Sequence, residues 1–395
     1  MPQSKRLSLE EEEEEEEEVM SEVHVGCPPN FSGPYISHFT FPSPLSSPGI
    51  QDWGHSDQLQ EGEPSTVMLR LDDDGDLALA RRGVKSLVQS RAQCIEDLHP
   101  HVKDTSSENL TFDEDGDLVL TRQSSNYERY PICAVAIQHS ITSSLPSVGL
   151  QVWMAALVLT DFVLHKISTS SDFNGTTALE LGAGTGLVGL VLALVARTIF
   201  ITGFTLWQST DRGSDVLENC TTNIRLNSSV LKYPETSVCV RELDWREQWP
   251  PRVQTRDSES QRLQYSWTPS EIEEAEGASF LFAADVIYND ELTDSFFSIL
   301  EKLMSRGSEK VLYLALEKRY NFSMDDLDVV ANGYAHFQSF LKDEEECIRL
   351  DDNLLPCFKG ERLDISHIPQ YIREYERGKD VELWKITYFS NKPRE

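Results

Sequence analysis

The chain has 395 residues, 39% of them hydrophobic and 26% charged, which is enough for two or three domains with a sizeable core. Its formal net charge of −31 argues against binding to a phosphate backbone, which requires a face rich in lysine and arginine. The acidity suits a basic partner, such as a lysine-rich protein segment, although solubility alone explains it as well.

Membrane insertion and secretion are also disfavoured. No uninterrupted apolar run approaches the roughly 20 residues of a membrane-spanning helix. The first residues lead into polyglutamate without the apolar stretch of a secretory signal. The seven cysteines include no Cys-x-x-Cys pair and are too widely spaced for a zinc site. We therefore expect an intracellular protein with reduced thiols, no metal site, no membrane segment and no direct contact with nucleic acid.

The first part of the chain, residues 1–65, predicts a disordered acidic and proline-rich tail. Nine consecutive glutamates at 10–18 repel one another and cannot pack into a core. Six prolines follow between residues 28 and 48 in a polar stretch. Such runs are usually solvated tails, although this one could also bind a basic partner.

Residues 66–130 contain an internal repeat and predict a small accessory region. Met68–Arg81 recurs as Asn109–Arg122, and both copies carry alternating apolar residues on each side of an Asp-Gly pair. This pattern is typical of a β-hairpin with a tight turn. The aspartates resemble the start of a calcium loop, but the glycine comes one position early and no glutamate closes the loop. We expect two hairpins.

In residues 131–395, strand-like and helix-like segments alternate. The predicted strands are 132–137, 176–181, 198–202, 236–243, 280–287, 310–317, 346–350 and 382–389. The predicted helices are 146–166, 187–196, 214–227, 291–306 and 323–341, and a capping box at Thr268 adds a short one in the polar insertion 246–278. Such alternation predicts an α/β, Rossmann-like domain with a seven-stranded, mostly parallel sheet and helices on both faces.

A glycine-rich loop follows the second of these strands. Thr177–Leu181 runs into Gly182-Ala183-Gly184-Thr185-Gly186 and then into a helix. Glycines let a backbone turn sharply and approach a ligand closely. The loop also fits the dinucleotide pattern Gly-x-Gly-x-x-Gly. Glu180 favours S-adenosylmethionine, because a carboxylate there can meet the ammonium of its methionine part, whereas a pyrophosphate needs no anion. A dinucleotide site and an empty turn remain the alternatives.

Four further motifs occur in a fixed order around this loop. They are Gly149-Leu-Gln-Val-Trp153 before it, Glu242-Leu-Asp-Trp245 after the next two strands, Ala283-Ala-Asp-Val-Ile-Tyr288 and Glu317-Lys-Arg319. No single motif is specific, but the set is. Over about residues 110–390 the chain resembles the family-16 seven-β-strand methyltransferases, which are protein-lysine methyltransferases that use S-adenosylmethionine. The resemblance implies an enzyme of this kind with a protein substrate.

The resemblance also implies roles for individual residues. Asp285 and Tyr288, an Asp-x-x-Tyr motif, would face the cofactor and the acceptor as the catalytic pair. The cofactor would be bound by Trp153, Glu180, Gly182, Ala183, Gly184, Gly186, Asp211, Asp244, Trp245 and Ala284, with Asp211 on the ribose hydroxyls and Trp245 beside the adenine. One departure is the insertion Gly203–Ser209 between the strand 198–202 and Asp211. This insertion supports the alternative of a non-catalytic scaffold.

The implied chemistry is an in-line attack of a neutral lysine amine on the sulfonium methyl group. The protein must align the two groups, exclude water and favour the deprotonated amine. No sequence signal makes Asp285 or Tyr288 a general base. We expect a monomer that acts on a basic segment of a non-histone protein in the nucleus, the cytoplasm or both, with chaperones among the candidate partners. Transfer to RNA, a small molecule or arginine is the alternative.

Overall fold

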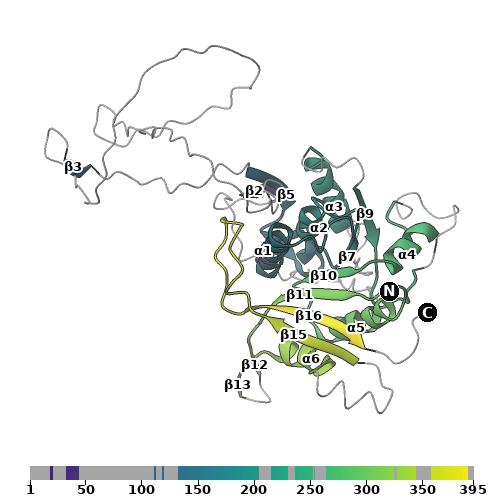
Figure 1. Cartoon of the computed structure of the whole chain (residues 1–395). Coiled ribbons are helices and arrows are strands. Elements are labelled where there is room, and N and C mark those ends of the chain that lie inside the picture. Colours follow the sequence, from purple (N-terminus) through teal and green to yellow (C-terminus); the bar gives the residue numbers. More distant parts are fainter. Residues whose placement is uncertain are drawn as a thin grey trace, which may run out of the picture. The chain divides into compact units, whose positions relative to one another are not determined.

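The computed structural model describes residues 18–20, 33–43, 111–112, 118–119, 132–203, 215–229, 236–251, 253, 264–323, 327–343 and 357–389. They belong to two compact units. One combines Met1–Ser47 with Arg129–Glu395, and the other is Pro48–Glu128. The large unit contains a central sheet with its helices (Figure 1).

The central sheet has the strand order β14-β15-β16-β11-β10-β7-β8-β9. The strands are β7 (Thr177–Leu181), β8 (Thr198–Gly203), β9 (Ser237–Glu242), β10 (Phe280–Ala284), β11 (Val311–Glu317), β14 (Leu341–Lys342), β15 (Cys357–Leu363) and β16 (Val381–Phe389). Only β16 runs antiparallel to its neighbours. The expected mostly parallel α/β sheet is confirmed, and the two-residue β14 extends its seven main strands at one edge.

Helices cover both faces of this sheet. The helices α1 (Met154–Thr169), α2 (Leu187–Leu192) and α3 (Asp215–Leu226) contribute buried side chains to one core cluster. The helices α4 (Pro269–Glu276), α5 (Asp290–Met304) and α6 (Asn332–Phe340) contribute to the second. Strand β7 lies between them, with every residue buried. A strand covered on both faces has no polar side, which explains its nearly continuous apolar sequence.

Several predicted elements have different bounds in the structure. The helix expected at 146–166 is preceded by a 3-10 turn, η2 (Leu145–Leu150), with proline at its start. The helix expected at 323–341 is divided into a hairpin, β12 (Asn321–Ser323) and β13 (Asp328–Val330), and the shorter α6. Adjacent β-branched residues at 329–330 favour the strand. The strand expected at 346–350 lies outside the described residues, and the sheet is completed by β15.

The expected disordered tail is wrong at Tyr35–Pro42, which form strand β2. This strand pairs antiparallel with β5 (Ile132–His139) over its whole length. Phe39 and Phe41 are fully buried in the core that α1 and α2 share. The flanking prolines hid this alternation of apolar and polar residues. Further toward the N-terminus, β1 (Glu18–Met20) pairs with β6 (Thr142–Ser144), and the rest of 1–65 lies outside the described residues.

The small unit contains one described strand pair, β3 (Thr111–Phe112) with β4 (Leu118–Val119). The two strands flank the Asp-Gly pair of the second repeat and run antiparallel. This confirms the strand pairing of the hairpin predicted there. The first repeat lies outside the described residues.

Three asparagines, two on α3 and one directly after it, hold the second edge of β5. The Oδ1 of Asn223 accepts the backbone N–H of Gln138 at 2.7 Å, and its Nδ2 donates to the carbonyl of Gln138 at 3.1 Å. Asn227 bonds Ala136 in the same two-way manner at 2.8 and 2.7 Å. Asn219 also donates to the carbonyl of Gln138. The amides of Asn223 and Asn227 each satisfy a backbone donor and a backbone acceptor, as a neighbouring strand would, so Ala136 and Gln138 on this edge of β5 are paired.

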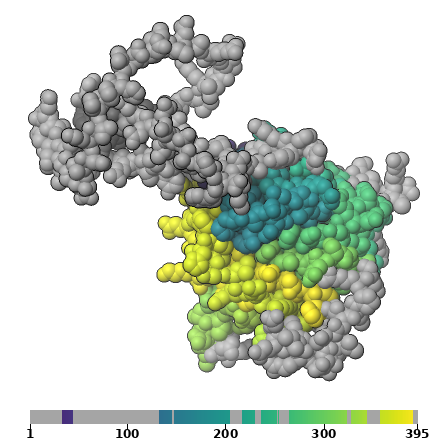
Figure 2. Space-filling model, in the orientation of Figure 1, coloured from purple at the N-terminus to yellow at the C-terminus, as the bar shows by residue number. Residues whose placement is uncertain are grey.

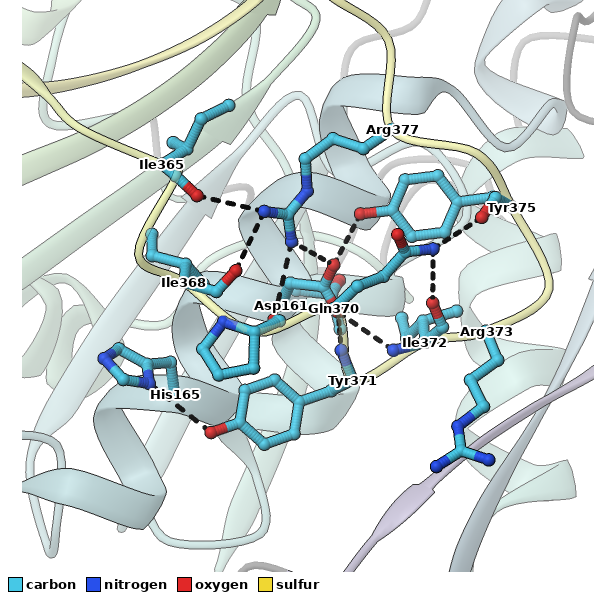
Figure 3. Close-up of polar contacts among 12 residues, drawn as sticks. Asp161, His165, Ile365, Ile368, Gln370, Tyr371, Ile372, Arg373, Tyr375 and Arg377 are labelled. Atoms are coloured by element: carbon cyan, nitrogen blue, oxygen red, sulfur yellow. Dashed lines mark hydrogen bonds and ion pairs between the residues drawn. The ribbon is translucent and has the colours of Figure 1, made fainter.

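The loop between β15 and β16, residues 364–380, is fastened to α1 by one buried carboxylate (Figure 3). Asp161 on α1 is fully buried and accepts the backbone N–H groups of Tyr371 and Ile372, both at 2.9 Å. It also accepts the hydroxyl of Tyr375 and pairs with Arg377 at 2.8 Å. Four donors around one carboxylate stabilise a loop that has no regular secondary structure.

The same loop contacts the N-terminal strand. Glu374 accepts hydrogen bonds from the backbone N–H and the hydroxyl of Thr40 on β2, at 3.1 and 2.6 Å. Figure 2 shows the yellow C-terminal segment lying against the blue segment that contains α1. Residues 364–380 therefore join the last strands of the chain to α1 and β2.

Among the described helices, none is long and apolar enough to cross a membrane.

The Asp161→Ala variant tests this fastening. The change leaves the guanidinium of Arg377, with 17% side-chain exposure, and two backbone N–H groups without their acceptor. We expect a loss of about 3–5 kcal/mol in the free energy of unfolding, measured by urea denaturation. The control is Asp172→Ala, which removes a half-exposed pair with Lys166 and should cost at most about 1 kcal/mol. Equal losses in the two variants would contradict the role of Asp161.

Candidate active site

The carboxyl ends of β7, β10 and β11 meet at one edge of the sheet, because these strands are adjacent and parallel. The glycine-rich loop, the Asp-x-x-Tyr motif and Lys318-Arg319 follow directly after these ends. Trp153 joins them at the start of α1. In open α/β sheets this edge is where ligands bind. The structure thus gathers most of the predicted site residues in one place.

The glycine loop has a backbone that only glycine adopts easily. Gly182, Gly184 and Gly186 have φ angles of 66°, 54° and 78°. A Cβ on Gly182 would lie 2.8 Å from a methyl group of Val286 and 3.0 Å from the ring of Trp245. The loop is therefore pressed against the segments that follow β9 and β10, and a larger residue would separate them.

Neighbouring elements hold this loop in one shape. The N–H of Ala183 donates to the carbonyl of Thr202 on β8 at 2.8 Å. The Cys220 thiol donates to the carbonyl of Gly184 at 2.9 Å, and Asn223 donates to that of Thr185 at 2.9 Å. Because α3 supplies two of these bonds, the loop is preformed without a ligand contact.

Glu180 faces the protein interior. Its side chain is buried, and its Oε2 accepts the backbone N–H of Gly189 on α2 at 2.9 Å. A Cβ on Gly189 would lie 2.6 Å from this oxygen. Gly189, the last glycine of the Gly-x-Gly-x-x-Gly pattern, therefore makes room for the carboxyl. Burial raises the pKa of Glu180 to about 8, and the Gly189 hydrogen bond opposes this only in part. Glu180 thus positions Gly189, and its expected contact with the ammonium group of the cofactor stays a prediction.

Asp285, Arg319 and Trp153 form a continuous chain of contacts. The Asp285 side chain is 1% exposed and pairs with the guanidinium of Arg319. That guanidinium lies 4.8 Å from the ring centre of Trp153, whose indole N–H donates to the carbonyl of Val148. Asp285 also has a φ of 55°, a conformation rare in residues with a Cβ and frequent at functional sites. Three predicted or motif residues from distant segments thus form one unit.

Tyr288 lies at the outer rim of this unit. It is half exposed, whereas Ala284, at the end of β10, is partly buried and precedes Asp285. Desolvation and the negative charge of Asp285 raise the pKa of the Tyr288 hydroxyl, and Arg319 partly offsets them. The hydroxyl therefore keeps its proton at neutral pH and can both donate and accept a hydrogen bond.

Asp244 and Trp245, which follow β9, are both largely enclosed, and their expected contact with the cofactor stays a prediction. Trp245 is buried, with its ring 5.1 Å from that of Phe296 on α5. Asp244 accepts from the backbone and the guanidinium of Arg246 at 2.9 to 3.1 Å. The edge of the Trp245 ring approaches Gly182, so we infer that Trp245 supports the glycine loop.

Asp211, the predicted ribose ligand, lies outside the described residues, as does the insertion beyond Gly203. Strand β8 continues to Gly203, which pairs with Glu242. A Cβ at Gly203 would lie 2.8 Å from the Cδ2 methyl of Leu217 on α3, so a larger residue there would displace that side chain. Within the described part of the chain, no group of three or more histidine, cysteine, aspartate or glutamate side chains could hold a metal ion.

Two residues of the site, Arg319 and Asn223, were not among the predicted site residues, although Arg319 lies in the Glu317-Lys-Arg319 motif. A cation directly after a parallel strand could have been paired with Asp285, because the two follow adjacent strand ends. The spacing of asparagines at 219, 223 and 227 places them on one helix face. That periodicity signals a shared partner, but it does not say which segment the partner is.

Comparison with known proteins agrees with this site. Residues 136–260 match the family model described as lysine methyltransferase. Methyltransferase-like protein 22 of Homo sapiens is 35% identical over 348 residues, 86% of this chain and 77% of that protein. Its Mus musculus counterpart is 33% identical over 344 residues, 85% of this chain and 79% of that protein. Protein N-lysine methyltransferase METTL21A of Danio rerio is 31% identical over 170 residues, 43% and 61% of the two chains.

The sheet order, with one antiparallel strand next to β11, and the glycine loop after β7 define an S-adenosylmethionine-dependent methyltransferase. Within this class, the chain belongs to the lysine methyltransferase family, and it shares most of its length with methyltransferase-like protein 22. The family and the enzyme class expected from the motifs are thereby confirmed.

The Glu180→Gln variant tests the buried carboxyl. Native Glu180 keeps its proton up to about pH 8, whereas the unfolded chain releases it above about pH 4.5. Wild-type stability should therefore fall by about 1.4 kcal/mol per pH unit relative to the variant as the pH rises through this window. Glutamine keeps an acceptor for Gly189 and does not titrate. Urea unfolding at several pH values measures the difference, and parallel curves for the two proteins would contradict it.

Proposed function

We propose that this protein transfers a methyl group from S-adenosylmethionine to the side-chain amine of a lysine in a non-histone protein. The observation that carries the proposal is the meeting of the preformed glycine loop, the Asp285–Arg319–Trp153 unit and the half-exposed Tyr288 at one sheet edge. Membership of the lysine methyltransferase family supports lysine as the acceptor.

The residues at this edge fit the cofactor. The turn 182–186 has no bulky side chain and bends through left-handed glycines, so its backbone can lie against the methionine part. Trp153 and Ala284, both partly buried, would line the same space, and Asp211 stays our prediction for the ribose hydroxyls. When bound, S-adenosylmethionine supplies a methyl group on a positively charged sulfur.

The chain's own residues then have to position a neutral amine. Arg319 neutralises Asp285, so the pair adds little net charge beside the methyl group. Tyr288 keeps its hydroxyl proton and lies at the rim, where it can accept a hydrogen bond from the incoming amine and direct its lone pair. An ordinary lysine has a pKa of about 10.4. A weakly polar site beside the positively charged sulfur lowers this pKa and so favours the deprotonated amine.

The remaining expectations about partners and location are part of the same proposal. We infer that the acceptor lysine lies in a basic segment, because the chain carries a net charge of −31. Cys133, Cys220 and Cys239 are free thiols, which supports a reducing compartment, the nucleus or the cytoplasm. A monomer is proposed, with chaperones among the candidate substrates, and light scattering of the purified chain would test the first point.

The activity is tested with labelled cofactor and an extract of cells depleted of this protein. Wild-type protein should label at least one protein band, and acid hydrolysis of that band should yield methyl-lysine. Cofactor binding is measured separately by calorimetry. No labelled band together with no binding heat at millimolar cofactor would overturn the proposal.

The Tyr288→Phe variant tests the acceptor site in the same assay. Phenylalanine keeps the ring and removes the hydroxyl, so the labelling rate should fall by about tenfold to a hundredfold while cofactor affinity stays unchanged. Asp294→Asn on the exposed side of α5 is the control and should keep the wild-type rate. A Tyr288→Phe rate equal to that of wild type would show that the hydroxyl does not position the amine.

A further inference from the structure

Exposed apolar side chains gather in the segment that follows β11. Phe322, Leu327 and Val329 are 60%, 73% and 58% exposed, and Tyr320 is 51% exposed. Phe322 and Val329 face each other across the hairpin of β12 and β13, so they form one apolar surface. A hairpin of two three-residue strands has too little packing to be stable on its own, and an uncovered apolar pair does not help it.

This hairpin is anchored to the proposed active site. It begins one residue after Tyr320, which directly follows Arg319, the partner of Asp285. The backbone N–H of Lys318 donates to the carbonyl of Asp380 at 3.0 Å, and the Tyr320 hydroxyl donates to the Asp380 side chain at 3.3 Å. The base of the hairpin is therefore fixed at the carboxyl end of β11, next to Arg319, and Figure 1 shows β12 and β13 following this end.

Charge and backbone strain both distinguish the hairpin from an ordinary surface turn. Residues 320–330 contain three aspartates and no lysine or arginine. Leu327 has a φ of 52°, which is unfavourable for a bulky residue and usually occurs where function requires it. An apolar pair next to the exposed carboxylate of Asp328 on β13 matches a partner segment with apolar side chains among lysines or arginines.

We propose that the β12–β13 hairpin is the docking surface for the protein substrate, which it holds by a basic segment with apolar residues next to the acceptor lysine. This inference rests on the proposed function, because the hairpin would bring that lysine to Tyr288. Phe322 and Val329 contact the apolar residues of the segment, and Asp328 attracts its cations. The hairpin thereby selects the substrate, whereas the glycine loop binds only the cofactor.

The double variant Phe322→Ser/Val329→Ser tests the docking surface in the full-length chain. The probe is the band that wild type labels in the depleted cell extract, followed over a dilution series of the extract. In dilute extract the initial rate should fall at least about tenfold, and it should return toward the wild-type rate as the extract is concentrated. Cofactor affinity should not change.

The matched control is Phe389→Ser/Ile132→Ser, which removes one aromatic and one β-branched residue that are 52% and 76% exposed elsewhere. Its labelling rate should stay within about twofold of wild type. Thermal unfolding of both double variants shows whether the fold is intact. A rate loss of equal size in the control, or no loss in the hairpin variant, would overturn the proposal.

A photo-crosslinking residue provides a second measurement that does not depend on tolerance of serine. Benzoylphenylalanine in place of Phe322 keeps an aromatic side chain, and irradiation should join the protein to a species that carries the methyl label. The same replacement of Phe389 should give none. A labelled adduct from position 389 but not from 322 would overturn the docking site. If wild type labels no band at all, the proposed function fails first, and this inference fails with it.

Discussion

The hydrogen bond between the buried carboxyl of Glu180 and the backbone N–H of Gly189 is the constraint from which the site is built. A carboxyl that is removed from water has to be neutral or hydrogen-bonded. This bond therefore sets how closely β7 and α2 pack together. The approach fixes the turn between them, and that turn presses on Val286, Trp245 and, through Gly184, on the carbonyl of Gly149. Four segments from distant parts of the sequence are thus placed by one interior contact, before any ligand is considered.

The additions outside the sheet support the same turn. The Oδ1 of Asn223 accepts a backbone N–H of β5, and its Nδ2 donates to the carbonyl of Thr185. One side chain therefore links β5 to the glycine loop. Strand β2 covers the other edge of β5 and is itself held by Glu374 in the loop before β16. The N-terminal strand is therefore a structural part of the methyltransferase domain and not an appendage to it.

Much of this was readable from the sequence, because it depends on local patterns. The alternation of strands and helices, the glycine loop and the capping box at Thr268 each have a short-range signature, and the structure contains all three. Long-range pairings have no such signature. The strand at Tyr35–Pro42 could not be predicted for two reasons. Prolines lie in and around it, and its partner strand is about a hundred residues away. The direction of the Glu180 side chain was likewise not predictable, because a carboxylate at a strand end can face a ligand or a helix, and only the packing at Gly189 decides.

The order of chain synthesis matters for a sheet arranged in this way. Among the described strands, β16 comes last in chain order, yet it lies in the interior of the sheet between β11 and β15. The bond between Thr40 and Glu374 joins residues 334 positions apart. The sheet therefore closes only after β16 has been made, and until then β11 has one unpaired edge. Such delayed, non-local closure makes folding slow and exposes an aggregation-prone edge. A chain truncated before β16 should therefore aggregate more readily than the full chain.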